Sequence, residues 1–561
     1  MVHISTSLAL LGAFVSLAST STANVLPRQT SDTTFDYVIV GGGAAGAVLA
    51  NRLTENRSVS VLLLEAGPDN TGKIEAVVPY IYSRLFGSDW NWNYTIVPQP
   101  GLNNRVVPYF RGHVLGGSTE IKYHRLTVSK NEQFVPGTND NGRFLSSTHG
   151  TSGPIGVSLN QVNQWILEPT LTAAQQSGVW AFNQDNNDGD PIGISWQQFA
   201  IKGGQRSSAA TGYLNQQVRA RSNLKIQVNS RATRSNPLTF STVEYKNDVT
   251  GATGQVTARR DIILSAGVID TPALLLRSGL GPTADVQAAG ITPLVNLPAV
   301  GQHFVDHAGT PIAWQVNTTL TDDEIDKNST LLNQLLDEWN ASKTGRLTTT
   351  SLAHIQFSRL PSNASIFQTV ADPQEGKADA PHFEALLANK WTLLAPRPAT
   401  GNFVGMTHFC LSPLSRGSVR LNPQNPQGAP LIDSGSLSHP FDIFTLRYAI
   451  RQTARFFQAP VWRTYNAQPV FDPAILDSDS ALDEYIRNNS FGGAHGVATA
   501  KIGKANSPAG TDVVGPDFRV KGVSGVRVVD ASVIPFSPGG HAMVPVYVVA
   551  EKAADIIKAN P

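Results

Sequence analysis

The clearest pattern in the chain lies near the N-terminus, where two apolar runs flank a glycine-rich segment. Tyr37–Val40 and Val59–Leu64 are short, continuous apolar runs of the kind that form buried strands. Between them, the alanine-rich stretch Ala47–Leu53 predicts a helix. A strand, a helix and a second strand in this order predict a β-α-β unit, and therefore an α/β fold with parallel strands.

The turn between the first strand and the helix carries the glycines of a dinucleotide-binding site. Gly41 permits the tight turn, Gly43 lets the backbone approach a pyrophosphate, and Gly46 lets the helix pack closely on the strand. The helix N-terminus adds unpaired N–H groups and a partial positive charge. Glu65 ends the second strand, where an acid accepts a ribose hydroxyl; this favours NAD or FAD over NADP. The alternative is a glycine loop in an ordinary α/β turn.

Further strands and helices are predicted along the rest of the chain. The predicted strands are Leu224–Val228, Val243–Tyr245, Asp261–Leu264 and Val526–Asp530. The predicted helices are Asp322–Trp339, Phe441–Phe457, Pro545–Lys558 and an apolar helix with Pro272 near its first turn. Residues 131–165 are rich in Asn, Gly, Ser and Thr, so we expect loop or surface there.

Composition and charge indicate a globular protein with no bias toward nucleic acid or an anionic membrane. The chain has 561 residues, of which 41% are hydrophobic and 15% charged, and its net charge is +1. This length allows two or three domains, or two large interleaved ones. The only cysteine, Cys410, cannot form an internal disulfide, so we expect it to be a small buried hydrophobe.

The N-terminus predicts secretion. Leu8–Ala18 is an apolar run too short to span a bilayer, and the small residues Ser19–Ala23 follow it, so we expect a signal peptide cleaved near Ala23. An N-glycosylated extracellular protein is consistent with the Asn-x-Ser/Thr sequons at Asn56, Asn93, Asn317, Asn328, Asn340, Asn363 and Asn488.

Besides the turn at Gly41–Gly46, three other glycine-rich turns are candidate ligand-binding or catalytic sites. The pair Gly116 and Gly117, followed by Ser118, can bring backbone N–H groups against a flat or anionic ligand. His495 and His541 each lie in a glycine-rich turn, where backbone and imidazole can approach a ligand closely. The alternative for both histidines is an ordinary place in a surface turn.

From Asp36 to the C-terminus the chain resembles the glucose–methanol–choline (GMC) flavoprotein oxidoreductases, and among them the fungal aryl-alcohol oxidases. The motifs are Gly41–Gly46 with Glu65-Ala-Gly67, Arg111-Gly-His-Val-Leu-Gly-Gly-Ser118, Gly204-Gln-Arg-Ser-Ser208, Ser265-Ala-Gly267 through Thr271-Pro272 to Ser278-Gly-Leu-Gly281, Val300-Gly-Gln-His-Phe-Val-Asp306-His307, His495-Gly-Val-Ala-Thr-Ala, and Val528-Val-Asp530-Ala-Ser with His541.

The resemblance implies a Rossmann-like FAD-binding domain, discontinuous in sequence, with an inserted substrate domain of antiparallel sheet and helices. We place the FAD domain in residues 34–130, 200–307 and 505–561, and the substrate domain in residues 131–199 and 308–504. The residues that the resemblance assigns to FAD are Gly41, Gly43, Gly46, Glu65, Arg111, Gly116, Gly117, Ser118, Asp530 and Ala531.

The resemblance also assigns catalytic roles. His495 matches the residue that takes the alcohol proton, and His541 matches the residue that hydrogen-bonds the substrate oxygen, while the hydride passes to flavin N5. A neutral imidazole can accept a proton near neutral pH. Tyr123 matches an aromatic residue that stacks on the substrate ring in aryl-alcohol oxidases. The segment used for covalent attachment in relatives has no histidine at Ser118, Thr119 or Glu120, so we expect non-covalent FAD. We expect no metal in the site.

Several positions depart from the family pattern. Lys122 replaces Asn or His, Ala494 replaces an aromatic residue, Gly496 replaces proline, and His303 replaces Asn. After Leu126 a few dozen residues are missing relative to the family, either because the site has lost part of its cover or because the gene model skips coding sequence. These departures concern the substrate and the electron acceptor more than the fold.

We therefore expect a secreted, monomeric oxidoreductase that converts a primary aromatic or allylic alcohol to an aldehyde, with oxygen or a quinone as electron acceptor. One alternative is a dehydrogenase of secondary metabolism that acts on one specialised alcohol. Another is a flavoprotein without a redox role, either a lyase similar to the hydroxynitrile lyases or an inactive remnant.

Overall fold

The computed structural model of the chain describes residues 33–121, 130–137, 140, 142–235, 240–508 and 510–560. The predicted signal peptide, Lys122, Tyr123 and Leu126 lie outside the described residues, so the predictions made for them stay predictions.

The β-α-β unit forms as the sequence predicts. β1 (Thr33–Val40) runs parallel to β2 (Val61–Leu64), and α1 (Ala44–Leu53) connects them. The helix begins at Ala44, three residues before the predicted start, because Gly43 already serves as its N-cap. All of β2 is buried, which explains why the two strands read as continuous apolar runs and not as alternating ones.

β1 lies inside a seven-stranded sheet with the strand order β11-β2-β1-β14-β13-β12, in which β25 also pairs with β14. The other strands are β11 (Leu224–Gln227), β12 (Ser230–Ser235), β13 (Thr242–Asn247), β14 (Thr253–Leu264) and β25 (Val526–Val528). β11, β2, β1, β14 and β25 are mutually parallel, so their carboxyl ends share one edge. Gly41, Glu65, Ser265 and Asp530 follow the ends of four of these strands at that edge.

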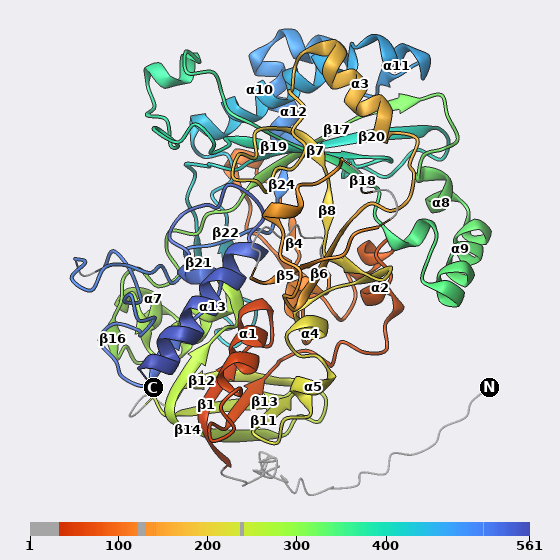
Figure 1. Cartoon of the computed structure of the whole chain (residues 1–561). Helices are drawn as coiled ribbons and strands as arrows, with labels where there is room; N and C mark the ends of the chain where they lie inside the picture. Colours follow the sequence, from red (N-terminus) through yellow and green to blue (C-terminus); the bar gives the residue numbers. More distant parts are fainter. Residues whose placement is uncertain are drawn as a thin grey trace, which may run out of the picture.

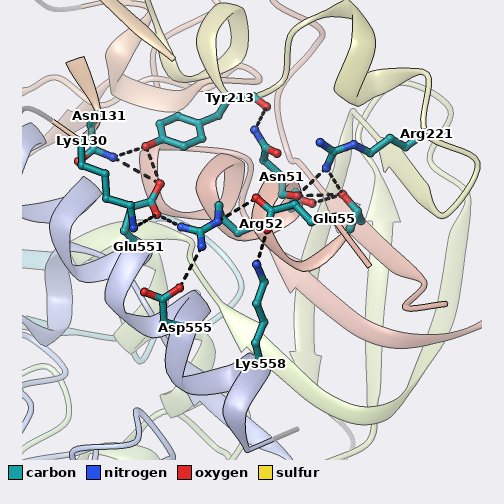
Figure 2. A network of polar contacts seen from close by, with 12 residues as sticks. Asn51, Arg52, Glu55, Lys130, Asn131, Tyr213, Arg221, Glu551, Asp555 and Lys558 are labelled. Carbon is teal, nitrogen blue, oxygen red and sulfur yellow. Dashed lines mark hydrogen bonds and ion pairs between the residues drawn. The ribbon is translucent and has the colours of Figure 1, made fainter. Parts of the chain in front are cut away.

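The two ends of the described chain meet where α1 packs against α13 (Met543–Ala559), as Figures 1 and 2 show. Arg52 on α1 forms ion pairs with Glu551 and, at 2.9 Å, with Asp555 on α13. Tyr213 OH also donates to Glu551 Oε1 at 2.9 Å, and Lys130 Nζ lies 3.0 Å from Glu551 Oε2. This network fixes the C-terminal helix, and with it the turn that carries His541, against the dinucleotide-type helix.

A second seven-stranded sheet has the order β23-β17-β20-β19-β18-β7, with β24 paired to β17. Its pairings are antiparallel. Its strands are β7 (Gly193–Trp196), β17 (Ala308–Val316), β18 (Leu352–Ser358), β19 (Phe383–Ala388), β20 (Asn402–Cys410), β23 (Gln468–Pro469) and β24 (Phe491–Gly492). On the side away from the first sheet lie α3 (Leu167–Ser177), α10 (Pro440–Phe457), α11 (Pro460–Thr464) and α12 (Asp479–Asn489) (Figure 1). Cys410, at the end of β20, is buried as predicted.

Shorter elements connect these layers. They are α2 (Ile74–Val77), α4 (Ala209–Gly212), α5 (Gln216–Arg219), α7 (Thr283–Ala288), β3 (Tyr94–Thr95), β4 (Pro108–Tyr109), β9 (Ile201–Lys202), β10 (Gln205–Arg206), β15 (Leu280–Gly281), β16 (Val295–Asn296), β21 (Ser418–Arg420) and β22 (Leu431–Asp433).

The prediction of loop or surface for residues 131–165 is wrong in part. β5 (Glu132–Phe134) and β6 (Ile155–Leu159) form a small sheet with β8 (Gln198–Phe199). His149 in this segment is buried between two carboxylates, with Nδ1 2.8 Å from Glu132 and Nε2 2.7 Å from Asp185. Its polar composition resembles that of a surface segment, but in the structure these polar side chains are buried and hydrogen-bonded to one another.

Two predicted helices differ from the structure. α6 (Gly267–Arg277) begins well before Pro272, which therefore lies inside the helix. Because proline has no N–H, the carbonyl of Val268 one turn earlier is released, and it accepts a hydrogen bond from Thr499 Oγ1 at 2.7 Å. The predicted helix over 322–339 is divided into α8 (Asp323–Lys327) and α9 (Ser329–Ser342), since Asn328 caps the second helix through its side chain.

Candidate active site

A cavity of about 320 Å³ opens at the shared edge of the parallel strands. It brings together most of the predicted site residues: Gly41, Gly43, Glu65, Arg111, Gly117, Ser118, His495, Asp530 and Ala531. Gly46, Gly116 and His541 do not line it. Gly46 acts behind it, since a Cβ there would lie 1.9 Å from the carbonyl oxygen of Gly41 and would push α1 away from the turn.

The N-terminus of α1 faces this cavity without a partner of its own. Gly43, its N-cap, makes no side-chain capping bond, and the first turn of the helix holds no acidic residue. A Cβ on Gly43 would meet only the Cα of Gly117, at 3.9 Å. The backbone is therefore open toward the cavity, and the helix end presents N–H groups and positive potential to an anionic group.

Glu65 fastens the glycine turn as well as facing the cavity. Its Oε2 accepts the N–H of Gly42 at 2.7 Å, and its Oε1 accepts the N–H of Gly67 at 2.7 Å. Burial raises the pKa of Glu65, and these two amide hydrogen bonds oppose the rise. Each carboxylate oxygen keeps a second lone pair, so the predicted contact with a ribose hydroxyl is compatible with both bonds.

Asp530 and Arg111 hold the far wall of the cavity. Asp530 Oδ2 accepts from the N–H of Gly267 at 2.8 Å and from Thr271 Oγ1 at 2.6 Å, so it joins the end of β25 to the start of α6. Arg111 Nη1 donates to the carbonyl of Ala494 at 3.0 Å. Asp530 thus stabilises the start of α6, and Arg111 contacts the turn that carries His495.

Trp92, Tyr94 and Asp270 also line the cavity, although sequence reasoning assigned them no role there. The rings of Trp92 and Tyr94 are stacked at 5.6 Å, and Tyr94 OH donates to Asp270 Oδ2 at 2.7 Å. Burial raises the pKa of Asp270, and the Tyr94 hydrogen bond opposes this. Neither aromatic residue lies in a recognisable motif, so no pattern in the sequence indicates that they line a cavity.

The backbone of the His495 turn is held by one carboxylate. Asp306 Oδ1 accepts the N–H of His495 at 2.7 Å and that of His307 at 2.8 Å, and Oδ2 accepts the N–H of Ala494 at 3.1 Å. Ala494 has φ 55°, a left-handed conformation that costs a non-glycine residue free energy. The hydrogen bonds from these backbone N–H groups to Asp306 stabilise the turn and thereby fix the backbone position of His495.

Three histidine rings meet at the site. The rings of His495 and His541 are stacked, with centroids 4.4 Å apart and planes inclined by 24°. His495 Nδ1 lies 3.1 Å from His307 Nδ1. The two predicted catalytic histidines are therefore side by side, although they are 46 positions apart in the sequence and β25 lies between them.

The antiparallel sheet presents one row of side chains to these histidines. Phe357, Glu384, Phe409 and Gly309 stand opposite one another on β18, β19, β20 and β17, so they share a face, and Phe491 on β24 continues the row. Phe409 approaches His495, with ring centroids 6.1 Å apart.

Glu384 in this row is fully buried, and His541 Nε2 donates to its Oε1 at 2.7 Å. Its other oxygen, Oε2, has no hydrogen-bond partner within the part of the chain that the structure describes, and the same holds for His541 Nδ1. The site thus combines an apolar wall with two buried polar atoms.

Solved structures of the same fold bind FAD or act on alcohols. A variant of Aspergillus oryzae formate oxidase, studied for its FAD modification, is 28% identical, with 94% of this chain and 99% of that chain covered and a TM-score of 0.83. A fungal aryl-alcohol oxidase is 27% identical with the same coverage and a TM-score of 0.80. The open glycine turn and the cavity beside it suit the pyrophosphate of FAD. The protein is an FAD-dependent oxidoreductase.

Sequence comparisons identify the family. The N-terminal model of the GMC oxidoreductases matches residues 35–309, and the C-terminal model matches residues 413–550. Dehydrogenase eriK of Hericium erinaceus is 35% identical over 95% of this chain and 96% of its own length. A pyranose dehydrogenase of Agaricus campestris is 34% identical over 94% of each chain. The chain belongs to the GMC oxidoreductase family, as its motifs predicted.

Proposed function

We propose that the protein oxidises the hydroxyl-bearing carbon of an alcohol to a carbonyl, with His495 as the base. The observation that carries this proposal is the place of His495, which lines the same cavity as the dinucleotide turn while its ring stacks on His541. FAD, when bound, supplies the two-electron acceptor. In this proposal it is held non-covalently by the glycine turn, Glu65, Arg111, and the Asp530–Ala531 pair.

His495 and His541 have different roles toward the substrate hydroxyl. His495 accepts the hydroxyl proton. His541 Nε2 donates to Glu384, so His541 Nδ1 faces the substrate and hydrogen-bonds the same oxygen when it also carries a proton. Glu384 thereby sets the orientation of the His541 ring. Phe409, packed near His495, excludes water from one side of the site.

We propose a primary aromatic or allylic alcohol as the substrate class. The row of Phe357, Phe409 and Phe491 on one sheet face offers an apolar wall for a flat substituent. Ala494 beside the base is small, which suits a bulkier or more specialised alcohol than an aromatic neighbour would allow. Oxygen or a quinone would reoxidise the cofactor.

A sugar is the second candidate. Pyranose dehydrogenases are among the relatives at 34% identity, and the buried Oε2 of Glu384 could accept a second substrate hydroxyl. A Glu384→Gln variant separates the candidates, because the amide can place an N–H₂ donor where the carboxylate would accept. Loss of sugar oxidation with benzylic oxidation retained would identify a sugar-type contact; equal loss for both would show that Glu384 acts only through His541.

The test of the proposed function is an anaerobic substrate panel on the FAD-loaded protein, with benzylic and allylic alcohols on one side and aldopyranoses on the other. Bleaching of the flavin band by one class identifies that class, and readmitting oxygen or adding benzoquinone identifies the acceptor. No bleaching with any alcohol, by protein that binds FAD in full, would refute the proposal.

We also propose that the protein is a secreted, N-glycosylated monomer with the two-domain division given above. Its seven sequon asparagines are all exposed: Asn56, Asn93, Asn317, Asn328, Asn340, Asn363 and Asn488. Across the described residues, no helix combines the length and apolar character needed to cross a membrane. Secretion by a fungal host and a mass decrease on treatment with an endoglycosidase are expected; an unchanged mass would contradict glycosylation.

A further inference from the structure

We propose that His307 is a positioning residue for His495: it accepts a hydrogen bond from His495 Nδ1 and so fixes the tautomer in which His495 Nε2 carries the lone pair. This inference deepens the proposed function and rests on it for its catalytic meaning. The contact itself is a property of the fold, so it can be measured whether or not His495 proves to be the base.

The geometry places the two rings in direct contact. His307 is fully buried immediately before β17, directly after the Asp306 carboxylate that holds the His495 backbone. Its Nδ1 lies 3.1 Å from His495 Nδ1, and the ring planes are inclined by 69°. A nitrogen-to-nitrogen contact at this distance is a hydrogen bond only if one nitrogen carries a proton and the other a lone pair.

The opposite side of the His307 ring decides which nitrogen is the acceptor. His307 Nε2 lies 2.8 Å from Ser537 Oγ, and the backbone of the next residue, Pro538, favours the protonated form of the ring. Proline has no backbone N–H, so its backbone can only accept from the ring. Both partners belong to the same turn, and in our inference the ring proton of a neutral His307 is therefore on Nε2.

His307 is also neutral. Burial lowers its pKa to about 4; nearby His541 lowers it further, while Glu384 opposes the change. A neutral imidazole with a proton on Nε2 has its lone pair on Nδ1. His495 Nδ1 must therefore be the donor of the contact, and the lone pair of a neutral His495 is on Nε2.

This arrangement prepares His495 for proton abstraction. A free imidazole exchanges between two tautomers, and only one of them has a basic Nε2. The bond to His307 persists and strengthens when Nε2 takes the substrate proton, because a charged donor makes a stronger hydrogen bond. In the proposed reaction the proton moves from the substrate oxygen to Nε2, and His307 neither gains nor loses one.

Two substitutions test the role. His307→Leu removes the acceptor, whereas His307→Asn places an amide oxygen close to the position of Nδ1. His354→Leu is the matched control, because His354 is equally buried and lies on the opposite face of the same sheet from Phe357. All three are assayed for FAD content, melting temperature and the pH dependence of kcat/KM.

We expect His307→Leu to lower kcat/KM about tenfold and to move its acidic limb about one pH unit toward acid, because the hydrogen bond favours protonated His495. The groups facing His495 and His307 besides each other are Asp306, Glu384 and His541, and they are unchanged in all variants. His307→Asn should restore most of the activity and the wild-type limb. A His307→Leu profile that matches His354→Leu would overturn the inference.

A second measurement needs no change at His307. Selective ¹⁵N labelling of histidine in the holoenzyme, with His495 assigned by the signal lost in His495→Gln, reports the tautomer directly. A protonated Nδ1 and an unprotonated Nε2 at neutral pH support the inference, and the reverse overturns it. An active His495→Gln enzyme would instead refute the proposed function, which keeps the two failures distinct.

Discussion

Asp306 offers the sharpest prediction about the site, because one carboxylate holds three backbone amides at and around His495. Asp306→Ala leaves the N–H groups of His307, His495 and Ala494 without their charged acceptor. Hydrogen bonds to a charged group contribute about 1.5–3 kcal/mol each. Water can enter the space left behind, so the three losses do not add fully, and we expect the free energy of unfolding to fall by about 3–5 kcal/mol.

Asp306→Asn gives a smaller, matched loss. Its amide oxygen can still accept from His307 and His495, but its N–H₂ group then faces the Ala494 N–H, so one bond of the three is lost. We expect about 1–2 kcal/mol for this variant. The activity should fall more steeply than the stability in both variants, by about 10²-fold in Asp306→Ala, because a displacement of about 1 Å at the base is enough for that loss.

Urea unfolding gives the free energies, and kcat per bound FAD gives the activities. An Asp306→Ala enzyme whose stability and kcat both match the wild type would refute the view that this carboxylate holds the His495 turn. Equal losses in the Asn and Ala variants would show that its charge alone matters, and that the individual hydrogen bonds do not.

Three further predictions concern the surrounding fold. Burial alone would lower the pKa of His149, but its hydrogen bonds to Asp185 and a second carboxylate raise it from 6.5 to about 9. The charged His149 therefore stabilises the fold by about 3 kcal/mol; this stabilisation is fully present below about pH 6.5 and is lost as the pH rises through about 9. Asp185→Asn should flatten a plot of melting temperature against pH. Arg52→Met leaves the largely buried Glu551 without its α1 partner and should cost about 2–4 kcal/mol in urea unfolding, whereas a wild-type midpoint would show that the pair is dispensable. Gly43→Val fills the space in front of the α1 N-terminus and should abolish FAD binding, measured by the flavin absorbance of purified protein, while the apoprotein stays folded.

The parts of the fold that could be predicted are those in which local sequence and tertiary environment agree. The β-α-β unit was predictable because its strands are buried on both faces and its glycines have few other uses. The helix over 322–339 was not, because the break depends on one asparagine acting as an N-cap, which the apolar spacing does not show. The buried segment around His149 was missed because its charges are balanced by Asp185, which is distant in sequence.

The site was predictable to the extent that its residues lie in motifs. The glycines, His495 and His541 were found in this way, and the structure brings the two histidines into contact. The roles proposed for Glu384 and His307 could not be predicted from the sequence, since Glu384 lies in an otherwise apolar strand and the motif that ends at His307 does not show what its ring contacts. Their roles follow only from the sheet register and the approach of distant loops.

The central claim is that His495 is the base of an FAD-dependent alcohol oxidation. The most direct test is the rate of anaerobic flavin bleaching after rapid mixing with a reactive alcohol, compared between the wild type and His495→Ala at equal FAD content. We predict that bleaching in the variant is slower by about 10²–10⁴-fold, the usual contribution of a positioned base, with the absorption spectrum of the oxidised flavin unchanged before mixing. Bleaching at the wild-type rate in His495→Ala would contradict the account.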